Sequence, residues 1–141
     1  MNNTALKIAV NMLAKRDYSI VELSNKLLQK SYTSDEINKA IIVLKQKGYL
    51  NDASLCEKLF FKYYQTHKYS ANYIAKKLLA QGFDENDILN NIDKVELSDE
   101  VDIAKSILRK KYSNFIEYDK EILVKFLLNK GFSHQTIENI Q

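Results

Sequence analysis

Apolar residues recur along this chain at the spacing of an α-helix. Near the start these residues are Leu6, Ala9, Val10 and Leu13. Intervals of three and four residues place them on one helical face, and the same spacing returns at residues 37–44 and 123–127. Proline is absent and glycine occurs only 3 times, so the residues that punctuate hairpins and long loops are nearly missing. The pattern predicts an all-α protein whose helices are joined by short turns.

One pattern occurs three times in the chain. Its marker reads KLLQKSY, KLLAQGF and FLLNKGF at residues 26–32, 77–83 and 126–132, so the copies are offset by 51 and 49 residues. Self-similarity at a nearly fixed period is the sequence signature of a repeat architecture. We therefore predict three tandem three-helix repeats, at residues 1–52, 53–97 and 98–141.

Polar residues at equivalent places in the copies predict where helices begin. They are Ser19, Thr33, Ser70, Asp84, Asp119 and Ser133. Such side chains cap the free N–H groups of a first turn, and Ser19 with Glu22 and Thr33 with Glu36 have the spacing of a capping box. Gly82 and Gly131 lie where a helix ends in a left-handed residue, and Ser31 takes that place in the first copy, where we expect slight strain.

Each repeat is expected to contain three helices. The predicted spans are 4–16, 19–30 and 33–47, then 53–67, 70–81 and 84–93, then 99–112, 119–130 and 133–140. The tight turn between the second and third helix of each repeat is typical of a helix-turn-helix, a pattern that does not by itself establish DNA binding. The links between repeats are short and apolar, so neighbouring repeats should touch and form an elongated, curved row.

Charge is distributed unevenly along the chain. The net charge is +3, but residues 1–83 carry 13 basic and 6 acidic side chains, whereas residues 84–141 carry 8 and 12. The asymmetry favours contact between the first part and a polyanion or an acidic protein surface. A charged face that only meets solvent is the alternative.

Basic residues near helix ends are the candidate partner-binding residues. They are Lys15, Arg16, Lys26, Lys30, Lys76 and Lys77. If they form one basic track, a filament or a phosphate backbone would meet them together. Helix C-termini also favour cations through the helix dipole, which explains part of the clustering without a partner. Arg16 has a second interpretation, as half of a structural ion pair beside Asp17.

No catalytic or metal-binding pattern is found in the sequence. The histidines, His67 and His134, are far apart, and the single cysteine, Cys56, has the spacing of a small core residue. Neither a glycine-rich phosphate loop nor a nucleophile elbow is present. The aromatic run at residues 59–64 favours core packing, with base stacking or an interface as the alternative. We expect a protein that is not an enzyme and needs no cofactor or metal.

The sequence also favours a cytoplasmic protein without membrane attachment. No stretch approaches the roughly 18 uncharged apolar residues of a spanning helix. The first residues, MNNT, have neither a basic region nor a cleavage site. A monomer is expected.

Three segments together resemble the RecX family. Residues 13–19, LAKRDYS, with the Glu22-Leu23 pair, are similar to the opening of its first repeat, in which an arginine and a serine precede Glu-Leu. Residues 48–52, GYLND, resemble its Gly-Tyr-Leu-x-Asp junction, and residues 130–133, KGFS, resemble its closing Gly-Phe-Ser element. The order and spacing agree over nearly the whole chain. Departures are Leu55-Cys56, where members commonly have Phe-Ala, and residues 68–70, KYS, where a glycine is common.

The resemblance implies a non-enzymatic regulator of the RecA recombinase. Such a protein lodges in the groove of the RecA filament on single-stranded DNA and restrains recombinase and co-protease activity. A further expected partner is single- or double-stranded DNA, bound weakly. Residue patterns predict the elongated shape and the charge asymmetry, while the partner is implied only by the resemblance. A sequence-tolerant DNA-binding helix-turn-helix array is the alternative, and a helical scaffold is a third. Only 2 of the 21 basic residues are arginines, which limits bidentate contacts to phosphate or carboxylate.

Overall fold

The computed structural model describes residues 4–140, and within this range the chain forms α-helices and one short 3-10 helix, with no strand. The α-helices are α1 (Thr4–Lys15), α2 (Ile20–Gln29), α3 (Ser34–Gln46), α4 (Asp52–Tyr64), α5 (Ala71–Ala80), α6 (Glu85–Ile92), α7 (Leu97–Lys111), α8 (Lys120–Asn129) and α9 (His134–Glu138), and the 3-10 helix is η1 (Phe115–Glu117). The all-α prediction is confirmed. Predicted ends differ by up to three residues, as at Tyr64, where α4 ends before the predicted residue 67.

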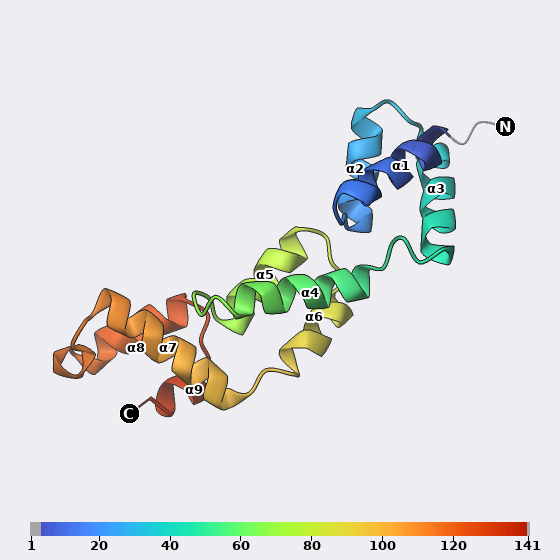
Figure 1. Ribbon diagram of the computed structural model, residues 1–141. Coiled ribbons are helices and arrows are strands. Elements are labelled where there is room, and N and C mark those ends of the chain that lie inside the picture. Colours follow the sequence, from blue (N-terminus) through green and yellow to red (C-terminus); the bar gives the residue numbers. More distant parts are fainter. Residues whose placement is uncertain (1–3, 141) are drawn as a thin grey trace.

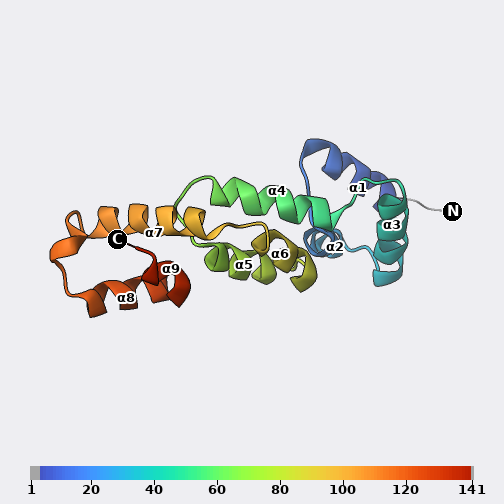
Figure 2. The ribbon, with the colours of Figure 1, turned by 90° about the horizontal axis from the view of Figure 1, so that it is seen from below.

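The helices group into three bundles in a row. Bundle 1 holds α1–α3, bundle 2 holds α4–α6 and bundle 3 holds α7–α9, and the helices of each bundle pack on one another. Figures 1 and 2 show the elongated arrangement, with bundle 1 set at an angle to the other two. The predicted row of three is confirmed. We propose 1–52, 53–97 and 98–141 as its structural units; residues 1–3 and 141 lie outside the described residues.

Two apolar cores hold the row together. Bundle 1 has its own core, which includes Ala9, Leu23, Leu27 and Leu44, all fully buried. Bundles 2 and 3 share one continuous core that runs from Cys56 in α4 to Phe132 after α8. A unit of about 45 residues buries little surface by itself, so bundle 3 depends on bundle 2 for part of its stability.

The predicted helix starts are confirmed at all six positions. Each N-cap side chain accepts a hydrogen bond from a backbone N–H in the first turn of α2, α3, α5, α6, α8 or α9. Thr33 and Glu36 form the complete capping box. The second predicted capping box is wrong in one half: Ser19 accepts from the Glu22 N–H at 3.1 Å, but the Glu22 carboxylate binds Arg16 instead.

The second helix of each bundle ends in the same left-handed turn. Ser31, Gly82 and Gly131 have φ values of 72°, 98° and 94°. The next N–H returns to the carbonyl five residues earlier, for example from Phe83 to Leu78 at 3.2 Å, which is a Schellman closure. The strained conformation expected at Ser31 is confirmed, because a side chain with a Cβ rarely adopts a positive φ.

At the junction of bundles 1 and 2, the start of α2 meets residues of bundle 2. The Ile20 N–H donates to Asp52 Oδ1 at 3.0 Å, and Lys58 Nζ lies 2.8 Å from Asp17 Oδ2. Burial raises the pKa of the Asp52 carboxyl. Gly82 lies against Val21 so closely that a Cβ on Gly82 would be 2.8 Å from Val21 Cγ2.

The junction of bundles 2 and 3 repeats this arrangement at the start of α5. The Ala71 N–H donates to the Glu100 carboxylate at 3.3 Å, and Tyr64 Oη donates to the same carboxylate at 2.7 Å. Ser70 Oγ donates to the Lys130 carbonyl at 2.8 Å. A Cβ on Gly131 would lie 2.6 Å from Ser70 Oγ. In both junctions, a carboxylate from the next bundle therefore caps the second helix and a glycine turn packs on that helix.

The two ends of the row differ from the junctions at the equivalent positions. The caps Ser19 and Ser70 are buried by the following bundle, whereas the third cap, Asp119, is exposed and charged. The turns that pack on a preceding bundle have glycine, whereas the turn of bundle 1 has the exposed Ser31. Contact between bundles thus decides where a neutral cap and a residue without a Cβ are required.

Candidate partner-binding surface

A groove of about 590 Å³ lies between bundles 1 and 2. Its walls come from the link before α2, from α2 itself, from one face of α4 and from the end of α5 with the following turn. The volume falls within the roughly 300–1,000 Å³ that is usual for binding sites in proteins. The groove lies beside the contacts that join the two bundles, which include Ile20 with Asp52, Asp17 with Lys58 and Val21 with Gly82.

Helix α4 has two faces, and one of them lines this groove. Cys56, Phe60 and Tyr64, at intervals of four residues, face the shared core and are buried. On the other face, the side chains that line the groove are Leu55, Lys58, Leu59, Lys62 and Tyr63. The core interpretation of the aromatic run is therefore confirmed for Phe60 and Tyr64, with Cys56 as a core residue, and Phe61 packs partly buried against the same core. Tyr63 also packs against this core and lines the groove.

The floor of the groove is apolar. Leu55 and Leu59 of α4, which are half-buried, and Val21 of α2, which is 42% exposed, contribute accessible apolar surface, while Phe83 after α5 lines the groove but is almost fully buried. Apolar side chains left accessible in a concave surface are typical of binding sites.

Two ion pairs lie in the walls. Arg16 Nη2 lies 2.7 Å from Glu22 Oε2, and the guanidinium sits 3.9 Å above the centre of the Tyr18 ring. The hydrogen bond to Glu22 is the main reason that the pKa of Arg16 is raised. The second pair joins Lys58 to Asp17, across the junction. Both carboxylates in the lining are thus already paired with a cation.

Lys62 and Lys77 remain without a carboxylate partner. Within residues 4–140, neither ammonium group lies within 4.0 Å of an acidic side chain. Lys77 Nζ lies 4.5 Å from the centre of the Tyr63 ring, a cation–π contact beside the groove. The groove therefore has an excess of positive charge over an apolar floor.

The predicted basic track is only partly brought together. Arg16 lines the groove and Lys77 contacts one of its lining residues. The remaining four candidates do not belong to its lining: they are Lys15, Lys26, Lys30 and Lys76, all exposed. The second interpretation of Arg16 agrees with the structure, with Glu22 as its partner in place of the Asp17 side chain.

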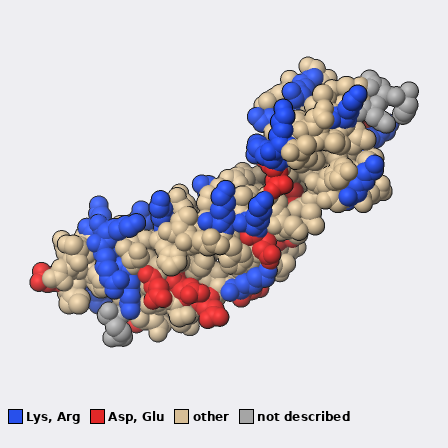
Figure 3. All heavy atoms as spheres, viewed as in Figure 1, with Lys and Arg blue, Asp and Glu red and all other residues tan. Residues whose placement is uncertain are grey.

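Sequence reasoning missed two sets of cations. Lys58 and Lys62 lie four residues apart on the same helical face as Leu55 and Leu59, a spacing that could have identified them. The exposed run at residues 109–111, RKK, ends α7. Figure 3 shows Lys and Arg in blue over all three bundles, including the end where α7 and α8 lie. Acidic side chains, in red, lie where bundle 1 meets bundle 2 and along the lower edge of the other two bundles.

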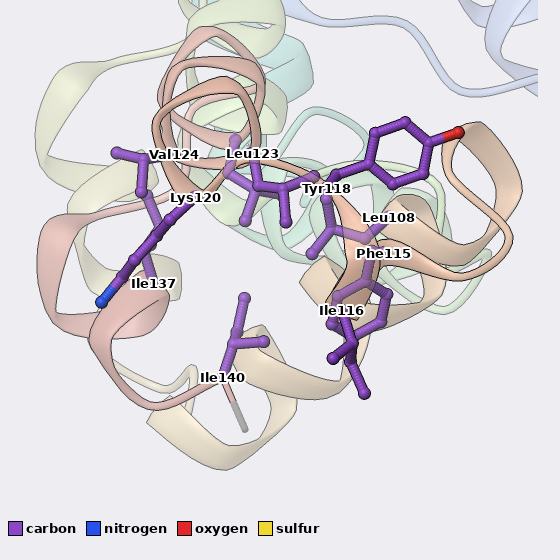
Figure 4. A pocket seen from close by; sticks show the side chains of 10 residues that line it. Leu108, Phe115, Ile116, Tyr118, Lys120, Leu123, Val124, Ile137 and Ile140 are labelled. Carbon is purple, nitrogen blue, oxygen red and sulfur yellow. The ribbon is translucent and has the colours of Figure 1, made fainter.

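A smaller apolar pocket of about 240 Å³ lies within bundle 3 (Figure 4). Its side chains come from α7, η1, α8 and α9, among them Leu108, Phe115, Leu123 and Ile140. Lys120 is the one charged residue in its lining, and the figure shows the amino group pointing away from the pocket.

Sites for metal binding or membrane insertion are not found in the described part of the chain. No group of three or more His, Cys, Asp or Glu side chains among residues 4–140 is placed to hold a metal ion. None of the described helices has the length and apolarity to cross a membrane.

Fold and surface together define a class: an all-helical array of three tandem helix-turn-helix bundles with a basic groove between the first two. A family model described as RecX, first three-helix domain, matches residues 5–42. The regulatory protein RecX of Haemophilus influenzae (strain PittEE) is 30% identical over 139 residues, which cover 94% of this chain and 89% of the relative. The chain belongs to the RecX family of regulatory proteins.

Other relatives and solved structures are similar over most of this chain. The regulatory protein RecX of Pectobacterium atrosepticum is 26% identical, with 98% of this chain and 96% of the relative covered. The crystal structure of RecX from Lactobacillus salivarius superimposes with a TM-score of 0.85 at 20% identity, and covers 95% of this chain and 90% of that one. A crystal structure of a regulatory protein RecX gives a TM-score of 0.87 at 16% identity, with 96% and 69% covered. The fold is therefore that of RecX structures.

Proposed function

We propose that this protein binds the RecA filament on single-stranded DNA and restrains its recombinase and co-protease activity, acting as a monomer in the cytoplasm. Membership in a family of regulatory proteins supports a protein partner, and RecA is the partner that the resemblance implies. The observation that carries the proposal is the elongated row of bundles with an inter-bundle groove that has unpaired cations. Several weak contacts along a repetitive filament add through effective concentration, so a long body with a site on more than one bundle suits such a track.

Retention on RecA-coated and on bare single-stranded DNA tests the proposal. We expect a pull-down to retain the protein preferentially on the coated DNA. Equal retention on both would contradict the proposal and favour the second candidate, a DNA-binding helix-turn-helix array. The specific observation behind that candidate is the exposed RKK run at residues 109–111, since consecutive cations can follow a phosphate backbone.

The basic candidates are tested by a charge-removing variant. Five residues are replaced by glutamine: Arg16, Lys26, Lys30, Lys76 and Lys77. Filament binding should weaken and depend less on salt, by about one unit of the salt slope for each phosphate-type contact that is lost. Unchanged binding and salt slope, in a variant with an unchanged melting temperature, would mean that these residues only form a solvated face.

Two controls make this experiment specific. A variant with the same loss of charge at other exposed positions replaces Lys7, Lys47, Lys68, Lys120 and Lys125 by glutamine, and should bind more tightly than the first. A second variant keeps Arg16 and removes only the four lysines, because loss of Arg16 also leaves Glu22 without its partner. The pair separates loss of a contact from disturbance of the junction.

A further inference from the structure

We propose that the groove between bundles 1 and 2 binds an extended acidic segment of a partner protein that carries one large apolar side chain. The proposal deepens the proposed function and rests on it in one respect, that the partner is a protein. It states which part of the surface receives the partner and what chemistry is recognised.

The apolar residues of the groove favour a ligand with one large apolar side chain, which we call the anchor. Leu55 and Leu59 are half-buried and line the groove together with Val21, which is 42% exposed. A leucine-sized side chain that enters the groove would remove these surfaces from water, which is the main favourable contribution in most protein associations.

Charge complementarity favours a ligand with acidic residues on either side of its apolar side chain. The lining contains Asp17 and Glu22, but each already binds a cation, Lys58 and Arg16 respectively. Lys62 in the lining and Lys77 beside it have no carboxylate partner within residues 4–140. Carboxylates of a ligand could therefore pair with Lys62 and Lys77 without breaking an existing ion pair.

The same details favour a peptide over a nucleic acid. The Arg16 guanidinium is held by Glu22 and stacked on Tyr18, so it is not available as a bidentate phosphate ligand. Asp17 and Glu22 would repel a continuous row of phosphates, whereas the carboxylates of a peptide can be spaced to avoid them. The leucines of α4 suit an aliphatic side chain. The aromatic residues of the lining offer little surface for base stacking, because Tyr63 is half-buried with Lys77 over its ring and Phe83 is only 3% exposed.

Fluorescence anisotropy with defined probes tests the proposal on the full chain. The first probe is a fluorescein-labelled peptide with the sequence Asp-Glu-Asp-Leu-Asp-Glu-Asp. The second has glycine in place of leucine, and the third is a single-stranded oligo(dT) with the same net charge. We expect the leucine peptide to bind at least about tenfold more tightly than the glycine peptide, because full burial of a leucine side chain is worth roughly tenfold to 150-fold in affinity. The oligo(dT) should bind more weakly than the leucine peptide.

Two variants with equal loss of charge locate the contact. Lys62→Gln with Lys77→Gln should weaken binding of the leucine peptide by about twofold to thirtyfold, since loss of each exposed ion pair weakens binding by up to about fivefold. The control, Lys7→Gln with Lys47→Gln, removes two exposed lysines outside the groove lining and should change binding by less than about twofold. Backbone amide shifts in NMR should move most at Val21 and Leu59.

Equal loss of affinity in both double variants would overturn the proposal, because binding would then reflect net charge alone. Tighter binding of oligo(dT) than of the leucine peptide, lost in the Lys62→Gln/Lys77→Gln variant, would also overturn it and assign the groove to nucleic acid. The filament pull-down keeps the two proposals apart. Peptide binding in the groove without preference for coated DNA would remove only the RecA assignment, and preference for coated DNA without peptide binding would remove only the groove assignment.

Discussion

Replacement of Gly131 by alanine should separate bundle 3 from bundle 2. Gly131 has a φ of 94°, and a Cβ at this position would lie 2.6 Å from Ser70 Oγ and 3.4 Å from the Tyr73 N atom. Ser70 is fully buried and its Oγ bridges two backbone groups, as acceptor from the Tyr73 N–H and donor to the Lys130 carbonyl. The serine therefore has no free space into which it can move, so the turn after α8 must move instead.

The expected loss of stability in Gly131→Ala is worked out by comparison with Gly48→Ala. Gly48 has a φ of 78°, but a Cβ there would have nothing within 4 Å. Gly48→Ala should therefore cost only the strain of a left-handed alanine, about 1 kcal/mol after the lower entropy of the unfolded chain is subtracted. Gly131→Ala adds overpacking of about 1–3 kcal/mol and weakens the hydrogen bonds from Ser70 and Asn72 to the turn. We expect it to lower the free energy of unfolding by about 3–4 kcal/mol.

Urea unfolding followed by far-UV circular dichroism measures both variants. Hydrogen exchange should also show faster opening of the Ala71 and Gly131 amides in Gly131→Ala than in Gly48→Ala. If the two variants lose the same stability, backbone strain explains both and the close contact between the turn and Ser70 has no energetic role. In that case the docking of glycine turns on preceding bundles would not explain the distribution of glycine.

Three further outcomes are expected. Ser31→Gly should stabilise the protein by about 0.5–1 kcal/mol in thermal unfolding, because it removes a strained left-handed serine from an exposed turn; no gain would mean that Ser31 is unstrained. Burial raises the pKa of Glu100 above the ordinary 4.5, so the folded state binds its proton more tightly and stability should fall as the pH rises from about 4.5. Glu100→Gln should flatten this fall, and an unchanged pH profile would contradict the assignment. The Cys56 thiol is buried and its pKa is raised to about 11, so it should react with a disulfide reagent only in step with urea unfolding, and fast reaction of the folded protein would be inconsistent with its core position.

Local features of the sequence were sufficient for the helices and their turns. Ser70 and Ser133 cap helices through hydrogen bonds to residues three positions further along, and such contacts require only the neighbouring sequence. The turns were predictable from the marker segments for the same reason, since the Schellman hydrogen bond from Phe83 to Leu78 spans only five residues. The number and order of the helices followed from these signals repeated along the chain.

The candidate site was harder to predict, because its residues meet across the fold. Lys58 and Asp17 are 41 positions apart in sequence, and nothing in the local pattern indicates that they pair. Glu22 has the spacing of a capping residue, yet it binds Arg16, which the fold brings within 2.7 Å. The predicted track included Arg16 and Lys77 on the basis of charge but omitted Lys62, whose role depends on which face of α4 is turned toward bundle 1.

The sequence by itself determined that this chain forms three similar helical bundles, because period, caps and turn residues act over a few positions. It also displayed a difference between the copies, Ser31 against Gly82 and Gly131, and a charged cap at Asp119 against the serine at Ser70. Only the tertiary structure decided what these differences mean. A turn that packs on a preceding bundle has no room for a Cβ, and a cap covered by a following bundle is buried away from water, where an unpaired charge would be costly.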